Sequence, residues 1–291
     1  MDLAGSCKSS LNVVVSPMTH AWLVIAHNEF GILQRLVSSL DDVRSDFFIH
    51  IDKKVKHLPE IRTQQSRLFV LKDRVDVRWG SVSQIECEMA LFEAAAQQGP
   101  YDYYHVISGV TLPLKPQSEI YSFFETSEKK SVLTGFCQDQ PYQETLKMRR
   151  YNFFLRSYTA RLSGIRAISQ FFWKSAIAAQ RVLGIETNRN KTFYKASNWL
   201  SLTEEAVQYI LHRKREILKT YRWSFCGDEY FVPSELMASP LKGMIINSDR
   251  YLHREITRST AATYRLDDLH VLAQTGCLFA RKFSDRSIIY T

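Results

Sequence analysis

Two adjacent carboxylates, Asp228 and Glu229, are the residues of this sequence best suited to acid–base chemistry. They are flanked by aromatic residues, namely Tyr221, Trp223 and Phe225 before them and Tyr230 and Phe231 after them. Aromatic surroundings exclude water from a carboxylate, which raises its pKa and makes it a usable base near neutral pH. A helix start explains the pair equally well, with Asp228 as N-cap or first-turn acid and Glu229 complementing the helix dipole.

Three further candidates lie next to predicted strands and helices. His27 follows the first apolar run, Asp52 follows the second, and Trp79 precedes a long predicted helix. In an open α/β sheet, ligands bind beyond the carboxyl ends of the strands, and the N-terminus of a helix binds phosphate. An acid after the second strand is suited to binding a ribose or the amide of a base ring. A turn-forming role for Asp52 is the alternative.

Alternating strand and helix patterns must position these residues. Short apolar runs predict strands at residues 20–26, 47–51, 68–71, 103–108, 131–136 and 199–202. Helical spacing and capping residues predict helices after Asn28, at 82–98, from Ser118, at 165–183 and from Thr203. This order, with short connections, predicts one domain with an open α/β sheet and right-handed crossovers.

Several common site motifs are missing from the sequence. It has no Gly-x-Gly-x-x-Gly and no Gly-Lys-Ser/Thr loop, which argues against a dinucleotide or P-loop site. It also has no Asp-x-Asp triplet, and its dispersed strand histidines are expected to pack in the core: His20, His27, His50 and His105. A bound diphosphate would then need Lys and Arg in place of a metal.

The net charge of +8 and the pI near 9.2 predict attraction to an anionic partner. The candidate partners are a nucleic acid, an acidic membrane face and a phosphorylated substrate. Residues 147–195 contain eleven Lys and Arg but one acid, Glu186. This segment either docks on an anionic inner membrane, where a lipid-linked acceptor is presented, or is a solvated face with an ordinary packed helix. The helix predicted at 165–183 carries the apolar residues Ile168, Phe171, Phe172, Ile177 and Val182.

The cysteines and the N-terminal residues indicate in which cellular compartment the protein is found. Five scattered cysteines without a Cys-x-x-Cys pair predict free thiols in a reducing compartment. No run approaches the roughly 18 apolar residues of a membrane-spanning helix. Residues 1–18 are a poor signal peptide and are expected to form a disordered lead-in. We therefore expect a cytoplasmic protein, with peripheral contact at the inner face of the plasma membrane under the docking interpretation.

Short motifs of this chain occur in the same order in the core-2/I-branching β-1,6-N-acetylglucosaminyltransferases, a family that includes the peptide O-xylosyltransferases. They are His27-Asn28, Ile-His-Ile-Asp at 49–52, Trp-Gly-Ser-Val-Ser-Gln at 79–84, residues 104–115, Asp228-Glu229, and Leu-Phe-Ala-Arg-Lys-Phe at 278–283. From about Thr19 onward the chain resembles the shorter bacterial branch of this family.

The resemblance implies a glycosyltransferase of the GT-A type, with a Rossmann-like central sheet flanked by helices. Residues 19–136 would form the nucleotide-binding half and residues 137–291 the acceptor-binding and catalytic half. Enzymes of this family invert the anomeric carbon and need neither a metal nor a cofactor, and the missing Asp-x-Asp triplet agrees with that.

Carried over by position, the resemblance makes Glu229 the catalytic base. His27 and Asp52 match positions near the uridine, and Trp79 matches an aromatic near the nucleotide. Lys282 matches the lysine that binds the diphosphate. Its partner arginine is expected to be Arg258, with Arg250 and Arg265 as alternatives.

On the acceptor side, Glu144 and Arg150 fall where the family contacts its acceptor, and Trp199 and Asp228 are further expected substrate contacts. One residue departs from the family pattern, because Thr111 stands where an acid usually follows the fourth strand. This departure puts the contact to the donor sugar in question.

The resemblance thus predicts transfer of a sugar, expected to be N-acetylglucosamine, from a UDP-sugar to a hydroxyl of a glycan or lipid-linked acceptor. Xylose or another UDP-sugar is the alternative donor within the same fold. Two other classes remain, a catalytically inactive sugar- or polyanion-binding relative and a nucleic-acid-binding protein. The latter has no recognised motif in this sequence, so we expect no nucleic-acid partner.

Overall fold

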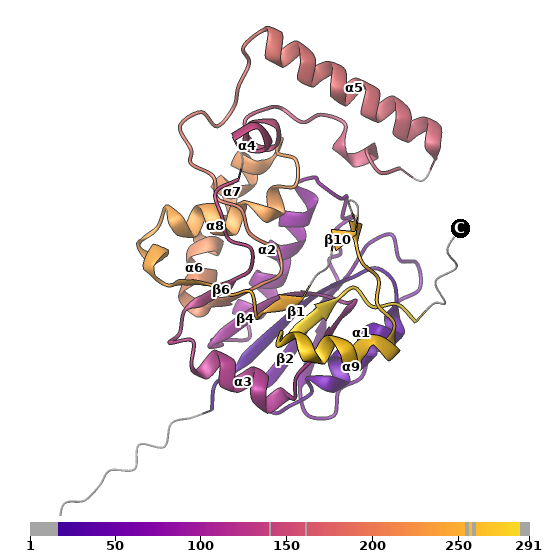
Figure 1. Cartoon of the computed structure of the whole chain (residues 1–291), viewed down its shortest axis with the longest axis vertical. Coiled ribbons are helices and arrows are strands. Elements are labelled where there is room, and N and C mark those ends of the chain that lie inside the picture. The colour runs from indigo at the N-terminus through magenta and orange to yellow at the C-terminus, as the bar shows by residue number, and fades with distance from the viewer. Residues whose placement is uncertain (1–16, 140, 161, 254–255, 258–259, 286–291) are drawn as a thin grey trace, which may run out of the picture.

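A seven-stranded sheet forms the centre of the computed structural model, which describes residues 17–139, 141–160, 162–253, 256–257 and 260–285 (Figure 1). The spatial order is β3-β2-β1-β4-β7-β6-β8. In chain order, the strands are β1 (His20–Ala26), β2 (Ser45–Ile51), β3 (Arg67–Val70), β4 (Tyr103–Ser108), β6 (Ser131–Leu133), β7 (Leu200–Thr203) and β8 (Ile245–Asn247).

Strand direction decides which residues share an edge of the sheet. Strands β1 to β4 are parallel to one another, whereas β7 runs antiparallel to both of its neighbours, β4 and β6. The carboxyl ends of β1, β2, β4 and β6 therefore meet at one edge, together with the start of β7. We call this the carboxyl edge. The central strands are buried almost throughout, which explains their continuous apolar character.

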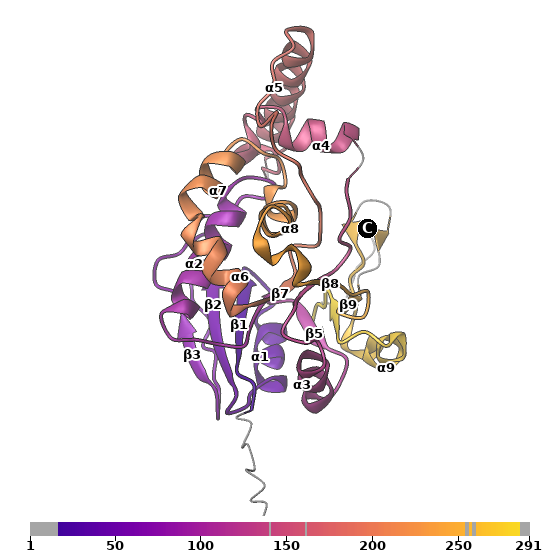
Figure 2. The same ribbon diagram turned by 90° about the vertical axis from the view of Figure 1, so that its left-hand side faces the viewer.

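Helices cover both faces of the sheet (Figure 2). On one face lie α1 (Phe30–Ser39) and α3 (Gln117–Glu125), and on the other lie α2 (Ser83–Ala96), α6 (Glu204–His212), α7 (Lys214–Tyr221) and α8 (Phe231–Met237). Beside α3, a second sheet joins β5 (Thr111–Pro113), β12 (Phe279–Arg281) and β9 (Leu252–His253) in the order β5-β12-β9. Strands β10 (Ile256–Thr257) and β11 (Thr260–Ala261) form a hairpin, and α9 (Leu269–Leu272) precedes β12.

Helices α4 (Pro141–Met148) and α5 (Ser163–Val182) belong to a segment between β6 and β7. Helix α5 projects from the body of the molecule, which both views show (Figures 1 and 2). Its buried side chains Trp173 and Ile177 belong to a small apolar cluster that is separate from the main core and also contains Leu155, Phe225 and Cys226. None of the helices in the described part of the chain is long and apolar enough to cross a membrane.

The open α/β sheet predicted from the sequence is confirmed, with differences at element ends. The strand expected at 131–136 ends at Leu133. Thr203 caps α6 as predicted, because its side chain accepts a hydrogen bond from the Ala206 amide at 3.4 Å. The predicted cap at Asn28 is wrong. Glu29 precedes α1 in a left-handed conformation, and its carboxylate accepts hydrogen bonds from Ser284 and Asp285 near the other end of the chain.

Candidate active site

Glu229 lines a cavity of about 290 Å³ at the carboxyl edge. The other lining residues come from the end of β6, the start of β7 and β9, and are Thr134, Gly135, Cys137, Asp139, Lys195, Ala196, Ser197 and Leu252. The Glu229 side chain is 28% exposed, and its Oε2 lies 3.6 Å from the Lys195 ammonium. Its backbone carbonyl accepts a hydrogen bond from the Ala196 amide at 2.9 Å. This bond ties the short helix η2 (Gly227–Glu229) to the segment that leads into β7. The carboxylate therefore has access to a bound molecule.

Asp228 points away from solvent and is only 5% exposed. Its Oδ2 accepts a hydrogen bond from the Gln84 side chain of α2 at 2.7 Å. Burial raises the pKa of Asp228 to about 7, and the Glu229 carboxylate acts in the same direction. Cys226 and Tyr230 occupy the N-cap positions of η2 and α8, so Asp228 is a first-turn acid and the predicted N-cap role is wrong.

Glu88, one helical turn beyond Gln84, is a second buried carboxyl group behind the cavity. It is 1% exposed, and neither of its side-chain oxygens has a hydrogen-bond partner among the described residues. Burial raises the pKa of Glu88 well above its usual range, with the charge of Asp228 as a second cause. Burial without a partner favours the protonated form of Glu88, because an isolated buried charge is costly.

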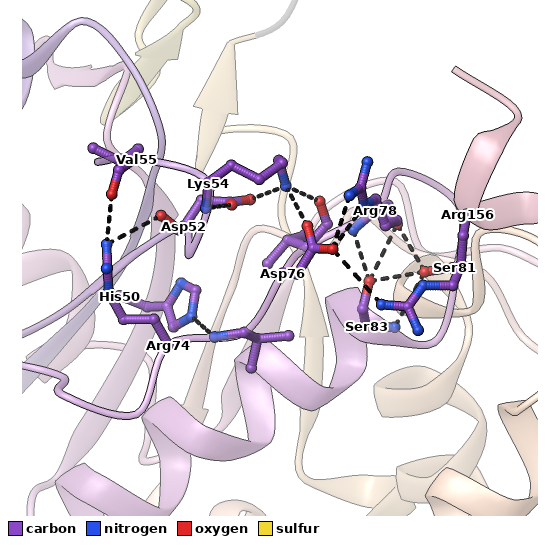
Figure 3. Close-up of polar contacts among 12 residues, drawn as sticks. His50, Asp52, Lys54, Val55, Arg74, Asp76, Arg78, Ser81, Ser83 and Arg156 are labelled. Carbon is purple, nitrogen blue, oxygen red and sulfur yellow. Dashed lines mark hydrogen bonds and ion pairs between the residues drawn. The ribbon is translucent and has the colours of Figure 1, made fainter. Parts of the chain in front are cut away.

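Trp79 stands at the entrance to α2, and its ring is 51% exposed. It packs edge-on against Phe225, with 5.3 Å between ring centroids. The next residue, Gly80, has a φ of +75°, and a Cβ there would lie 2.5 Å from the Phe225 ring. Glycine is therefore required for the turn that presents Trp79. The hydroxyl of Ser83 closes this turn by accepting a hydrogen bond from the Arg78 amide at 2.7 Å (Figure 3).

Asp52 is buried at the end of β2 and forms the predicted turn (Figure 3). Its Oδ1 accepts a hydrogen bond from the Lys54 amide at 2.8 Å, and its Oδ2 lies 2.6 Å from the Lys54 ammonium. Lys54 also lies 3.1 Å from Asp76, so the cation is shared between two acids. The turn-forming interpretation of Asp52 is thus confirmed, and its contact with a nucleotide stays a prediction.

His27 and Lys282 interact electrostatically although they are far apart in the sequence. Desolvation lowers the pKa of His27, and the charges of Lys54, Lys282 and Arg281 lower it further while Asp52 opposes them. Burial lowers the pKa of Lys282, with the Arg281 charge as a second cause. No acid pairs with the Lys282 ammonium within the described residues. Lys282 and Arg281 form a cationic cluster whose charge acts on His27, and such a cluster suits an anionic ligand.

The arginine partner of Lys282 cannot be placed at the predicted position, because Arg258 lies outside the described residues. Of the alternatives, Arg250 is exposed, and the exposed Arg265 lies 4.0 Å from Asp267. Arg281 is nearer. It lies opposite Thr111 in the β5–β12 pairing, and its guanidinium lies 4.6 Å from the ring centroid of Trp199.

The expected acceptor-binding residues Glu144 and Arg150 have partners inside the protein. Glu144 lies 2.6 Å from Arg149. Arg150 donates to the Ile185 carbonyl and lies 3.4 Å from Glu186. These contacts anchor the segment that carries α5, and acceptor binding by either residue stays a prediction.

Trp199 is 8% exposed, and its indole N–H has no hydrogen-bond partner among the described residues. A buried donor without a partner is uncommon in a native protein. The indole N–H is thus a buried donor without a partner among the described residues, and its ring lies under Arg281.

Three of the four strand histidines pack in the core as predicted. His20 and His105 share a 2.9 Å hydrogen bond, and His50 accepts one from the Val75 amide at 2.8 Å. His27 is the exception, since it is exposed. Among the described residues, no group of three or more His, Cys, Asp or Glu side chains gathers in a way that could hold a metal ion.

Sequence reasoning missed Lys195, Lys54, Arg281 and Glu88. Lys54 and Arg281 are neighbours of predicted residues, and Glu88 follows Gln84 by four positions, which places both on one helix face. Those spacings are signals that could have been used. Lys195 has no local signal, since only the pairing of its backbone with Cys137 brings it to the cavity.

The chain is similar to known proteins over most of its length. A family model described as Core-2/I-Branching enzyme matches residues 20–268. No curated protein matches the chain. Among solved structures, the apo crystal structure of mouse xyloside xylosyltransferase 1 is similar over 82% of this chain and 88% of that chain, with 8% identity and a TM-score of 0.38. The family match spans the sheet, His27, Asp52, Trp79 and Glu229, and the chain therefore belongs to the Core-2/I-branching enzyme family, glycosyltransferases with a GT-A type fold.

Proposed function

We propose that the protein is an inverting, metal-independent glycosyltransferase that moves N-acetylglucosamine from UDP-N-acetylglucosamine to a hydroxyl of a glycan or lipid-linked acceptor. The observation that carries this proposal is the pairing of two features at one edge of the sheet. One is the accessible Glu229 carboxylate in its cavity, and the other is the cationic cluster of Lys282 and Arg281. Leu252 of the cavity pairs with Phe279 of β12, three residues before Lys282, which joins the two features.

The cationic cluster of Lys282 and Arg281 suits the nucleotide diphosphate. His27 and Asp52 would contact the uridine at the ends of β1 and β2, and Trp79 would flank the nucleotide with its exposed ring. Lys282 would bind the diphosphate together with an arginine, either Arg258 or Arg281. Fixed cations in a site shielded from water stabilise the charge that develops on the leaving group.

Glu229 would act as the general base. It takes the proton from the acceptor hydroxyl, the oxygen bonds to the anomeric carbon, and the bond from that carbon to UDP breaks on the opposite face. An α-linked donor therefore gives a β-linked product. Asp228 supports this role, because its raised pKa of about 7 leaves much of it uncharged beside the catalytic carboxyl group.

Substrate contact on the acceptor side is proposed for Trp199, with Glu144 and Arg150 nearer the α5 segment. Asp228 would act by holding η2 in place, since it is buried. The donor sugar depends on the surroundings of Thr111, which lies opposite Arg281 where the family usually has an acid. Xylose is the alternative sugar. We further propose that the protein acts in the cytoplasm without a cofactor.

The test starts with a thermal-shift screen of UDP-sugars without added metal, followed by turnover of the strongest binder. Glu229→Gln should lower turnover at least 100-fold and leave UDP affinity unchanged, because a general base contributes about 10²- to 10⁴-fold. Glu60→Gln is the matched control, since the Glu60 side chain is 74% exposed. A Glu229→Gln variant with near-normal turnover would remove Glu229 as the base.

A further inference from the structure

Helix α5 has an inward face that fixes it to the body of the protein. This face consists of Ser169, Trp173, Ile177 and Gln180, which are all buried. The Trp173 indole donates a hydrogen bond to the Asn152 side chain at 3.0 Å, and the Gln180 amide bonds to the Tyr151 carbonyl at 2.9 Å. The outward face of α5 is therefore held in a defined direction.

The outward face is apolar although it is open to solvent. Ile168 is 60% exposed, Phe171 is 65% exposed and Phe172 is 50% exposed. The rings continue onto the neighbouring loops, with 5.7 Å between the centroids of Phe172 and Phe154, and 5.3 Å between those of Phe153 and Trp223. We call this set the aromatic ridge, and its members are Phe171, Phe172, Phe154, Phe153 and Trp223.

The charged residues of α5 and the charged neighbour of Trp223 are all basic. Helix α5 contains Arg166, Lys174 and Arg181 and no acid. Arg222 lies over the Trp223 ring, 5.2 Å from its centroid. Contact between two copies of this face would bring like charges together, which disfavours self-association through the ridge. A negatively charged surface complements it.

The segment that carries α5 leaves the body beside the cavity that holds Glu229. Cys137 and Lys195 both line that cavity, and their backbones pair through hydrogen bonds of 2.9 and 2.8 Å at the neck of the segment. The Tyr158 ring, below α5, also lies 6.3 Å from the Trp79 ring. A surface bound by α5 would therefore be close to the catalytic edge.

We propose that α5 and the aromatic ridge dock the protein on an anionic phospholipid bilayer. Aromatic rings favour the boundary between headgroups and acyl chains, and a helix with an apolar face flanked by Lys and Arg lies in that layer. Arg166, Lys174 and Arg181 contact the anionic headgroups. The inference goes beyond the proposed function, because it concerns a surface outside the catalytic cavity and holds for any donor sugar.

Co-sedimentation of the full chain with vesicles tests the proposal, using phosphatidylcholine alone and phosphatidylcholine mixed with phosphatidylglycerol. Binding is expected only to the mixed vesicles. The double variant Arg166→Gln/Lys174→Gln should weaken it about 25-fold, at about fivefold for each cation. Phe171→Ser/Phe172→Ser should weaken it at least tenfold, because each ring loses its burial in the interface.

Matched control variants are available elsewhere on the surface. Val43→Ser/Leu58→Ser removes two exposed apolar side chains, and Arg35→Gln/Lys242→Gln removes two exposed cations. Both should bind the mixed vesicles within twofold of the unaltered protein. All of these side chains are exposed, so melting temperatures should stay equal.

Two outcomes would overturn the proposal. One is a chain that does not bind phosphatidylglycerol vesicles, or whose binding is unchanged in the Phe171→Ser/Phe172→Ser variant. The other is a dimer in analytical ultracentrifugation that this variant dissociates while the vesicles remain unbound, which would make the ridge a contact between copies. Turnover with a water-soluble acceptor should be the same in every variant, so failure of docking and failure of the proposed catalytic function are separate results.

Discussion

Replacing Asp228 by Asn should change the pH dependence of stability in a defined direction. Burial raises the pKa of this group from 3.8 in the unfolded reference to about 7 in the folded protein. Between these values the unfolded chain has lost a proton that the folded protein keeps. Stability therefore falls as the pH rises through this window, and the loss is complete above about pH 7. Asn cannot ionise, so the stability of the variant does not fall in this way as the pH rises.

The magnitude follows from the shift of about three pH units. Each unit corresponds to about 1.4 kcal/mol, which gives a total of roughly 4 kcal/mol. Over the accessible window from pH 5 to pH 8 the loss is roughly 3 kcal/mol. The Asn carbonyl can still accept the hydrogen bond from Gln84, so the geometry behind the cavity is retained.

Urea unfolding followed by circular dichroism at pH 5, 6, 7 and 8 measures this effect. The free energy of unfolding of Asp228→Asn, relative to the unaltered protein, should rise by roughly 3 kcal/mol across the series. The free energy of unfolding of Glu88→Gln, relative to the unaltered protein, should also rise with pH, because burial also raises the pKa of Glu88. Asp249→Asn, at an exposed position, is the control and should show no trend. If the difference for Asp228→Asn is constant from pH 5 to pH 8, the buried-carboxyl reasoning is wrong.

Three further predictions concern the proposed site. Lys282→Ala should weaken UDP binding about tenfold or more in calorimetry, since a charge-assisted hydrogen bond contributes about 1.5–3 kcal/mol. Exposed Lys242→Ala is its control, and unchanged UDP affinity would remove Lys282 from the site. Activity should survive EDTA, whereas loss that manganese restores would contradict the metal-free proposal. N-ethylmaleimide should inactivate the enzyme through Cys137, an exposed thiol that lines the cavity. Cys137→Ser should be active and resistant, and equal inactivation of that variant would place the effect elsewhere.

Local patterns were sufficient for most helices and strands. The apolar run at 20–26 forms a strand because its side chains are buried on both faces, and Thr203 caps its helix through a contact three residues away. The position of Asp52 at a strand end followed in the same way. Such features depend on neighbours along the chain, so the sequence alone predicts them.

Helix α5 shows where this reasoning stops. Its predicted boundaries agree with the structure, yet Ile168, Phe171, Phe172 and Val182 are exposed and only Ile177 of the predicted apolar set is buried. Periodicity gives the relative orientation of side chains on a helix but not which face meets the body of the protein. The choice of face depends on contacts with Asn152, Tyr151 and Phe225 that are distant in sequence.

The sequence by itself determined the order of the strands and helices, the carboxylate pair, and, through the family pattern, the choice of Glu229 and Lys282. Tertiary structure alone decided what surrounds each group. It leaves Glu229 accessible beside Lys195, buries Asp228 against Gln84, and lets the charge of Lys282 act on His27. Burial and charge depend on contacts across the whole fold, and these set the pKa of a carboxyl group or an ammonium. Residue type and spacing therefore name the candidates, and packing assigns their chemistry.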